Sequence, residues 1–362
     1  MNSASTAHLL VDVSAHGLGH LAQVAPVLNA LGGRLPNLRI SVRSGLSSGQ
    51  LRARIAPAFT HLPGASDFGY VMRDATRVDL AATALAYRRQ HAEWEQLLAR
   101  ETAFLAALKP DLVLSDVAYL PLAGAQRARL RSIAMCSLNW ADLFAHFFAG
   151  EAWAAAIHHE MLAAYNSAEV FLRLTPAMPM VDLAKRRSIA PVAAIGRSRR
   201  GELREKLGCA ADERLLLVAF GGFDKRLPIA GWPPAGKLRW LVPQAWCCEQ
   251  PGISPLESLG LAFTDLICSV DAVLTKPGYG TFTEAACNGT PVLYLRRENW
   301  PEQEPLIDWL ESNARCRAVD ESEMSALAIA SVVDELSRQP APPIPPAGGA
   351  DEAAAILAEC LS

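Results

Sequence analysis

Two histidines in a glycine-containing loop are the first residues of the chain that could carry out acid–base chemistry. The segment "VDVSAHGLGHLAQ" places His16 and His20 between an apolar run and a helical pattern, so we expect His20 in the first turn of a helix. The positive end of a helix dipole favours a neutral imidazole, which can remove a proton from a hydroxyl group. His20 is therefore a candidate general base, and local packing or hydrogen bonding is the alternative interpretation.

Asp116 is the candidate partner of that base. It ends the apolar run "DLVLSD", and the carboxyl ends of parallel strands gather at the sheet edge where a loop after the first strand would also lie. A carboxylate bound to the second ring nitrogen would fix the imidazole tautomer and stabilise the imidazolium. A helix N-cap is the alternative role for this aspartate.

Glycines follow two further apolar runs in the second half of the chain. "VAFGG" ends in Gly221 and Gly222, and "LTKPGYGTFTE" carries Gly278 and Gly280. No Gly-Lys-Ser/Thr follows either run, so neither is the phosphate loop of a nucleotide triphosphatase. Two glycine-bearing strand ends in one α/β domain instead predict a crevice for a nucleoside diphosphate.

Glu284 has two interpretations. Thr281 and Glu284 have the spacing of a capping box, in which both side chains satisfy backbone N–H groups at a helix start. Alternatively, a helix that opens at 278–281 holds an anion on its free N–H groups, and Glu284 reaches a ligand.

The segment 17–22 also matches the G-x-G-x-x-A pattern of a dinucleotide-binding unit. The stretch about twenty residues later, where an acidic residue would meet a ribose, reads "NLRISVRSG" and contains none. A dehydrogenase is therefore the weakest of the enzyme interpretations.

Composition excludes several classes of function. The chain has 362 residues, 51% of them hydrophobic and 20% charged, with a net charge of -3, so it provides no basic field for nucleic acid. The eight cysteines are scattered without zinc-site spacing, which favours reduced thiols. No apolar run reaches the ~18 residues of a membrane span. We expect a cytoplasmic protein that is soluble or peripheral to a membrane.

The elements that position these residues alternate between buried strands and helices, which predicts parallel sheets covered on both sides. In the first half we expect strands at 7–15, 38–43, 111–116, 131–137 and 168–174, with helices in the 20s, at 78–108 and at 119–129. In the second half we expect strands at 213–220, 238–243, 271–275 and 291–295, with helices near 264–270, 281–288, after 303 and at 351–361.

Proline-rich stretches divide the chain. We expect an N-terminal Rossmann-like domain at 1–175, an interdomain linker at 176–200 and a second Rossmann-like domain at 201–338. A proline-rich connector and a C-terminal helix occupy 339–362.

The order of these motifs resembles that of GT-B glycosyltransferases, in particular the UDP-glycosyltransferases and the peptidoglycan GlcNAc-transferase. "HGLGHLAQ", "PDLVLSD", "SLNW", "VAFGG", "DAVLTKPGYGTFTEAACNGTPVLYLRR" and "EQEPL" carry the resemblance, which spans nearly the whole chain. It implies two Rossmann-like α/β domains facing a cleft, the first binding an acceptor and the second a nucleotide sugar, with a UDP-sugar as the expected donor.

The resemblance also implies roles for residues. His20 matches the catalytic base and Asp116 its acidic partner, in an acceptor loop with His16, Gly17 and Gly19. Glu284 matches the glutamate that binds the donor ribose, and Gln303 with Glu304 matches the pair that contacts the donor sugar. The donor diphosphate site corresponds to Gly221, Gly222, Lys276, Gly278, Tyr279, Gly280 and Thr281, with Lys276 in place of a histidine.

The predicted reaction is an inverting transfer of a sugar to an acceptor hydroxyl without a metal or other cofactor, since no Asp-x-Asp motif of metal-dependent transferases is present. A non-catalytic sugar-nucleotide-binding module and a GT-B UDP-sugar epimerase are the alternatives.

The aromatic segment 137–153 leaves two interpretations of the acceptor side open. It forms either a wall for a lipid-linked or apolar acceptor, with peripheral membrane contact, or the core side of an amphipathic helix.

Overall fold

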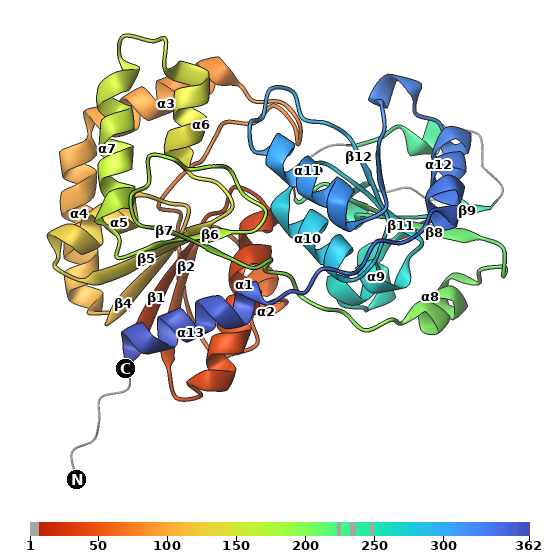
Figure 1. Cartoon of the computed structure of the whole chain (residues 1–362), viewed down its shortest axis with the longest axis horizontal. Helices are drawn as coiled ribbons and strands as arrows, with labels where there is room; N and C mark the ends of the chain where they lie inside the picture. Colours follow the sequence, from red (N-terminus) through yellow and green to blue (C-terminus); the bar gives the residue numbers. More distant parts are fainter. Residues whose placement is uncertain (1–6, 223–225, 232–236, 247–249) are drawn as a thin grey trace. The chain divides into compact units, whose positions relative to one another are not determined.

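The computed structural model describes residues 7–222, 226–231, 237–246 and 250–362 (Figure 1). The chain divides into two compact units. The first comprises Met1–Arg73, Val78–Val192 and Gly348–Ser362, and the second comprises Asp74–Arg77 and Ala193–Ala347. Each unit has its own parallel sheet, as predicted.

The first sheet has seven strands in the order β3-β2-β1-β4-β5-β6-β7, paired in parallel throughout. Its central strands β1 and β4 are buried along their whole length, because helices cover both faces of a parallel sheet. The strands are β1 (His8–Val13), β2 (Arg39–Ser44), β3 (Thr60–Pro63), β4 (Leu112–Asp116), β5 (Arg131–Cys136), β6 (Phe171–Leu174) and β7 (Arg186–Ile189).

Helix α5 of this unit packs against both α4 and α7, and α13 packs against α1. The predicted helix at 78–108 is two helices, because the backbone at Glu93 (φ −107°, ψ 15°) leaves the helical region. The helices are α1 (Leu18–Arg34), α2 (Ser48–Arg52), α3 (Leu80–Ala92), α4 (Trp94–Leu108), α5 (Leu120–Arg127), α6 (Trp140–Phe148), α7 (Ala154–Ser167) and α13 (Gly349–Leu361).

The second sheet has six parallel strands in the order β10-β9-β8-β11-β12-β13. They are β8 (Arg214–Ala219), β9 (Leu238–Val242), β10 (Ile253–Pro255), β11 (Ala272–Thr275), β12 (Val292–Tyr294) and β13 (Cys316–Ala318). The α-helices are α8 (Arg200–Leu207), α9 (Phe263–Ser269), α10 (Tyr279–Cys287), α11 (Gln303–Asn313) and α12 (Ala326–Arg338), with 3-10 turns at Ile229–Gly231, Gln244–Trp246, Leu256–Leu259 and Glu321–Glu323.

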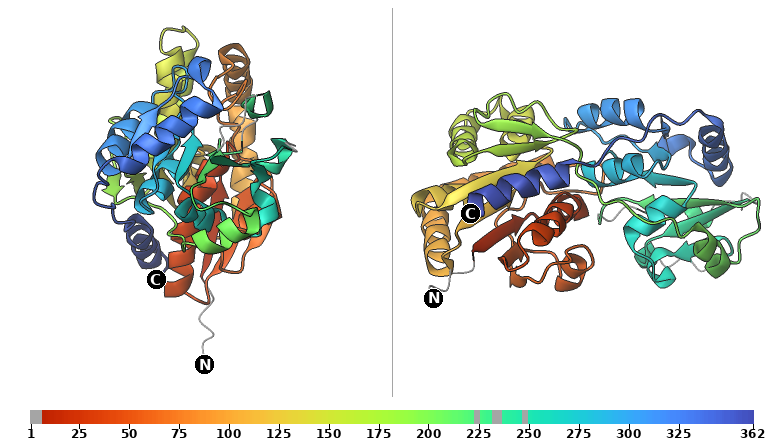
Figure 2. Two further views of the ribbon diagram at one scale, coloured as in Figure 1. Left: turned by 90° about the vertical axis from the view of Figure 1, so that its right-hand side faces the viewer. Right: turned by 60° about the horizontal axis from the view of Figure 1, so that its bottom comes forward.

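The predicted domain boundaries differ from those of the structure at three places, the first being Asp74–Arg77, which belongs to the second unit. Strand β7 lies inside the predicted linker but forms the edge of the first sheet. The C-terminal helix α13 returns to the first unit and lies beside α1 (Figures 1 and 2). Its start requires a glycine, because a Cβ atom on Gly349 would lie 2.0 Å from the carbonyl oxygen of Ala190.

Most of the large aromatic side chains of segment 137–153 that lie in helix α6 are packed in the core. Trp140, Phe144 and Phe148 are buried on one side of this helix, where Phe144 and Phe148 contact each other with ring centroids 5.3 Å apart. Phe147 is only partly buried and contacts Tyr70. The amphipathic-helix interpretation is therefore confirmed for three of the four large aromatic rings of α6.

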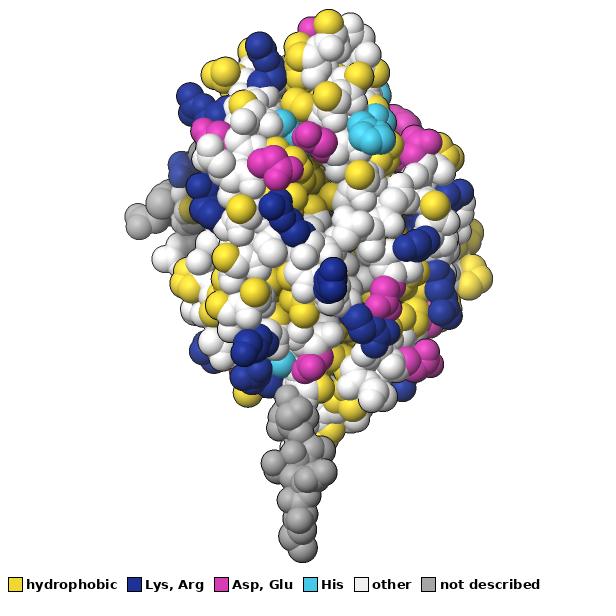
Figure 3. Space-filling view, turned by 90° about the vertical axis from the view of Figure 1, so that its left-hand side faces the viewer, with side chains coloured by type: hydrophobic (Ala, Val, Ile, Leu, Met, Phe, Trp, Pro, Cys, Tyr) yellow, Lys and Arg dark blue, Asp and Glu magenta, His cyan; other side chains and the backbone are white. Residues whose placement is uncertain are grey.

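No described helix is both long and apolar enough to cross a membrane. On the face shown in Figure 3, basic and acidic side chains are interspersed, consistent with the small net charge.

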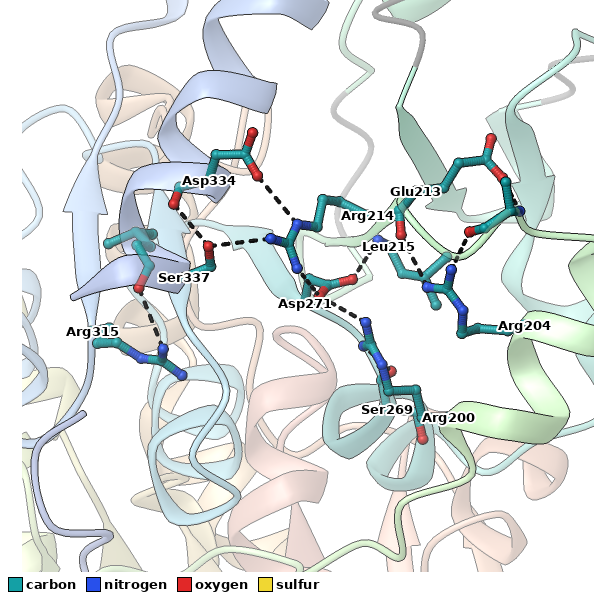
Figure 4. Close-up of polar contacts among 12 residues, drawn as sticks. Arg200, Arg204, Glu213, Arg214, Leu215, Ser269, Asp271, Arg315, Asp334 and Ser337 are labelled. Atoms are coloured by element: carbon teal, nitrogen blue, oxygen red, sulfur yellow. Dashed lines mark hydrogen bonds and ion pairs between the residues drawn. The ribbon is translucent and has the colours of Figure 1, made fainter. Parts of the chain in front are cut away.

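Asp271, which directly precedes β11, connects three segments of the second unit (Figure 4). Its carboxylate lies 2.8 Å from Nη2 of Arg200 in α8 and 3.3 Å from Nη1 of Arg214 in β8, and it accepts a 2.8 Å bond from the backbone N–H of Leu215. Arg214 extends the network to Asp334 of α12. This network ties α8 and α12 to the central strands of the unit.

We expect Asp271→Ala to lower the free energy of unfolding by about 1–3 kcal/mol, since it leaves the N–H of Leu215 without its acceptor in a buried position. Asp334→Ala is the matched control. Its carboxylate is 46% exposed and faces one arginine, so we expect a loss of less than about 1 kcal/mol. Urea unfolding of the whole chain measures both variants, and equal losses would contradict the role given to Asp271.

Candidate active site

The first group of site residues lies at the carboxyl edge of the first sheet. Strands β1 and β4 are neighbours, with Val13 in register with Asp116. The chain leaves β1 through a turn and enters α1 at Leu18, with Gly17 (φ 96°) at the N-cap. His20 therefore lies in the first turn of α1, as predicted, and faces the end of β4.

His20 and Asp116 form a buried pair. Nδ1 of His20 lies 3.2 Å from each carboxylate oxygen of Asp116, and the two residues are 5% and 0% exposed. Burial raises the pKa of Asp116, and the neighbouring His20 opposes that rise. With the Nδ1–H donating to the carboxylate, Nε2 is the nitrogen with a lone pair, which is the arrangement a general base needs.

His16 lies beside this pair but is held differently. Its Nε2–H donates to the carbonyl oxygen of Tyr70 at 3.1 Å, and its backbone N–H donates to the hydroxyl of Ser14. Its ring contacts Trp140 with centroids 5.3 Å apart. His16 therefore has the geometry of a structural residue of the loop, while His20 has that of a base. A Cβ atom on Gly19 would meet nothing within 4 Å, so the space beside this loop is open.

Sequence reasoning missed two residues around the pair. Cys136, at the end of β5, places its Sγ 3.9 Å from Nδ1 of His20. Asp67 accepts hydrogen bonds from Ser14 Oγ and Trp140 Nε1, the latter at 2.8 Å, and burial raises its pKa to about 6. Cys136 lies near the end of the predicted strand 131–137, so the argument from strand ends could have found it, whereas Asp67 lies in a loop without any motif.

Among the described residues, His20, Asp116 and Cys136 also form a group whose ligand atoms lie within 4.8 Å of one another. Nitrogen, oxygen and sulfur ligands of this kind suit Zn²⁺. A transfer assay in EDTA, with and without added Zn²⁺, tests the expected independence of metal.

The second group of site residues lies at the carboxyl edge of the second sheet. Strands β8 and β11 are paired with Ala219 opposite Thr275, so the turns that follow them are adjacent. Gly221 (φ 72°) and Gly222 (φ 87°) adopt the left-handed region that favours glycine. A Cβ atom on Gly278 would lie 3.3 Å from Nζ of Lys276, and one on Gly221 would lie 4.0 Å from it. Two of the predicted diphosphate residues, Gly221 and Gly278, thus lie beside the ammonium group of Lys276.

Helix α10 begins at Tyr279 with Gly278 as its N-cap, and no side chain caps it. The predicted capping box of Thr281 and Glu284 is therefore wrong, because Thr281 already lies within the first turn. The first backbone N–H groups of an α-helix have no partner within the helix, and in α10 they belong to Tyr279, Gly280 and Thr281. Glu284, in the second turn, is 1% exposed.

The two residues predicted to contact the donor sugar lie in different environments, Gln303 buried and Glu304 exposed. Gln303 is 7% exposed, and its amide bonds both the N–H and the carbonyl oxygen of Arg297, at 2.9 and 3.0 Å. Glu304 is 56% exposed and pairs with Arg296. The buried acid of this segment is Glu302, which accepts a hydrogen bond from Trp300 Nε1 at 3.0 Å. Sugar contact by Gln303 and Glu304 stays a prediction.

Arg297 is the largest omission of the sequence reasoning. It is 6% exposed, and its Cζ lies 3.6 Å from the centroid of the Trp300 ring. Its charge interacts with Lys276 and Glu302. Nothing in "YLRRENW" distinguishes it from the exposed Arg296, because burial of one of two adjacent arginines depends on the turn after β12.

No known protein-family model matches the chain. The chain is 28% identical over 329 residues to L-arabinokinase of Arabidopsis thaliana, an alignment that covers 85% of this chain. The chain spans only 30% of the length of that relative.

Two solved glycosyltransferases match the chain over its length. The glycotransferase of kitacinnamycin is 15% identical, with a TM-score of 0.61 over 99% of this chain and 95% of that one. A UDP-glucosyltransferase from Polygonum tinctorium, capable of glucosylating indoxyl, is 15% identical, with a TM-score of 0.60 over 99% of both chains. Each of the two units contains one parallel sheet with helices, as the predicted architecture requires. The prediction is confirmed, because the chain has the GT-B fold of these glycosyltransferases.

Proposed function

We propose that the protein is an inverting glycosyltransferase that moves a sugar from a UDP-sugar to an acceptor hydroxyl. The observation that carries this proposal is the buried pair of His20 and Asp116, with Nδ1 3.2 Å from the carboxylate, at the carboxyl edge of the first sheet. The glycine turns and the ammonium group of Lys276 in the second unit provide the chemistry for a diphosphate leaving group.

In the proposed reaction, Nε2 of His20 takes the proton of the acceptor hydroxyl. The acceptor oxygen forms a bond to the anomeric carbon, and the bond from that carbon to the diphosphate oxygen breaks on the opposite side. UDP leaves with the electron pair, and its new negative charge is stabilised by the N–H groups at the start of α10 and by Lys276. Asp116 stabilises the imidazolium formed on His20.

A transfer assay tests this function. A panel of UDP-sugars is incubated with a mixture of small hydroxyl-bearing acceptors in the presence of EDTA, and UDP release and product configuration are followed by NMR. We expect a glycoside with inverted anomeric configuration. A retained configuration would contradict the mechanism, and a loss of rate in EDTA that Zn²⁺ restores would contradict metal independence. Conversion of a UDP-sugar without acceptor would indicate an epimerase, and binding without turnover a non-catalytic module.

The pH dependence of UDP binding tests Lys276. Burial, and then the nearby Arg297, lower the pKa of this ammonium group to about 7. A bound diphosphate favours the charged form, so binding above pH 7 takes up a proton. We therefore expect the affinity for UDP to fall as the pH rises from about 7 to about 9, by a factor approaching ~10 per pH unit. Calorimetry measures this slope, and Lys276→Met should abolish it. An unchanged slope in that variant would show that another group takes up the proton.

A further inference from the structure

Arg297 presents an unused hydrogen-bonding edge in a buried position of the second unit. Among the described residues, its Nε and Nη2 atoms have no hydrogen-bond partner, although the residue is only 6% exposed. These two atoms carry the parallel N–H bonds of a guanidinium, the pair that binds a carboxylate or phosphate bidentately. A buried guanidinium with this edge unpaired is costly for the fold, so it indicates a ligand group that completes it.

The charges around Arg297 point to an anion. Lys276 and Arg297 carry two neighbouring positive charges, and the carboxylate of Glu302 is the negative charge that interacts with both. Burial lowers the pKa of Arg297 to about 9, and Glu302 opposes this shift. A second negative charge would reduce the repulsion between the two cationic side chains.

Arg297 interacts with residues of both parts of the predicted donor site, namely Lys276 of the diphosphate part and Gln303 of the sugar part. The charge of Lys276 interacts with that of Arg297, and the ammonium group of Lys276 lies beside the glycine turns at Gly221 and Gly278. Its backbone is held by both groups of the Gln303 amide, and its guanidinium is stacked on Trp300. Backbone and ring thus fix the guanidinium in place without using its Nε and Nη2 atoms, which is the arrangement of a pre-organised receptor.

We propose that the Nε/Nη2 edge of Arg297 binds an anionic oxygen pair of the donor, with Lys276 sharing its charge. This inference rests on the proposed function for the nature of the ligand. Two groups of a nucleotide sugar supply such a pair: the terminal phosphate of its diphosphate and a carboxylate on the transferred sugar. In the second case, Arg297 selects uronic acid donors.

Arg297→Met tests the proposal, with Arg296→Met as the matched control. Arg296 is adjacent in sequence, but its side chain is 47% exposed and pairs with Glu304. Calorimetry with inorganic pyrophosphate, UDP, UDP-glucose and UDP-glucuronate compares both variants with the wild type. We expect Arg297→Met to weaken binding by about 10- to 100-fold, as loss of a charge-assisted bidentate contact does, and Arg296→Met to leave it unchanged.

The pattern across the probes identifies the anion. A loss with all four probes assigns Arg297 to the terminal phosphate, and a loss confined to UDP-glucuronate assigns it to a sugar carboxylate. Unchanged affinity for all four would overturn the proposal. If the wild type binds pyrophosphate but no nucleotide, the proposed function fails. In that case the affinity of Arg297→Met for pyrophosphate still decides whether Arg297 binds an anion. If the wild type binds none of them, both proposals fail.

The ligand-free melting temperature separates a receptor from a structural residue. Because Arg297→Met removes a buried cation whose Nε and Nη2 atoms have no hydrogen-bond partner and keeps an apolar chain on Trp300, we expect it to melt at or above the wild-type temperature. A clear fall in melting temperature combined with unchanged affinities would assign Arg297 to packing and overturn the proposal. Arg297→Lys, which keeps the charge but loses the two-pronged edge, should recover only part of the lost affinity.

Discussion

Replacing His20 by alanine is expected to lower kcat by about 10²–10⁴-fold, the usual effect of losing a general base. The affinity for UDP should stay at the wild-type value, because His20 belongs to the first unit and the predicted diphosphate residues to the second. Single-turnover transfer and calorimetry with UDP measure the two quantities separately. Asp116→Asn should also lower kcat strongly, since an amide in place of the carboxylate no longer holds the Nδ1–H tautomer.

His159→Ala serves as the control, because this exposed histidine of α7 lies in the same unit. We expect it to retain wild-type turnover. Full turnover by the His20→Ala variant with a competent donor and acceptor would show that the base is another residue.

Replacing Glu284 by glutamine is expected to weaken UDP binding by about 10- to 100-fold, the range of one or two hydrogen bonds to a charged group. The proposed role is acceptance of the donor ribose hydroxyls, and a glutamine keeps the side-chain volume in a position that is 1% exposed. Pyrophosphate, which has no ribose, should bind the variant as it binds the wild type. Calorimetry with both ligands distinguishes this variant from Arg297→Met.

Glu205→Gln on the exposed side of α8 is the matched control for the same chemical change. A loss of UDP and pyrophosphate binding together, with a lower melting temperature, would assign Glu284 to the structure of α10 instead.

The sequence predicted the strands that position the site because parallel strands are continuous apolar runs. "DLVLSD" became β4, and "DAVLT" became β11, each with its polar end at the site edge. The pairing of His20 with Asp116 followed from this topology alone, across 96 residues of sequence. The long helical pattern at 78–108 concealed the break at Glu93, because α3 and α4 are each helical and the change lies in one backbone conformation.

Other features depended on tertiary contacts that no local pattern records. Thr281 and Glu284 have the spacing of a capping box, but in the structure Gly278 is the N-cap and the helix starts at Tyr279. Proline-rich segments suggested a linker at 176–200, but Arg186–Ile189 still pairs with the sheet edge. Burial of Arg297 follows from its hydrogen bonds to Gln303 and its packing on Trp300, which are contacts within one turn of the folded chain.

We propose that the second unit binds a nucleoside diphosphate sugar, and a thermal-shift panel tests this binding most directly. The panel contains UDP- and dTDP-sugars, UDP, pyrophosphate and NAD. A ligand at ~100 times its dissociation constant stabilises the folded state by roughly 2.7 kcal/mol, so we predict a clear rise in melting temperature with UDP and at least one UDP-sugar, and none with NAD. The absence of a shift with every nucleotide sugar would contradict the account.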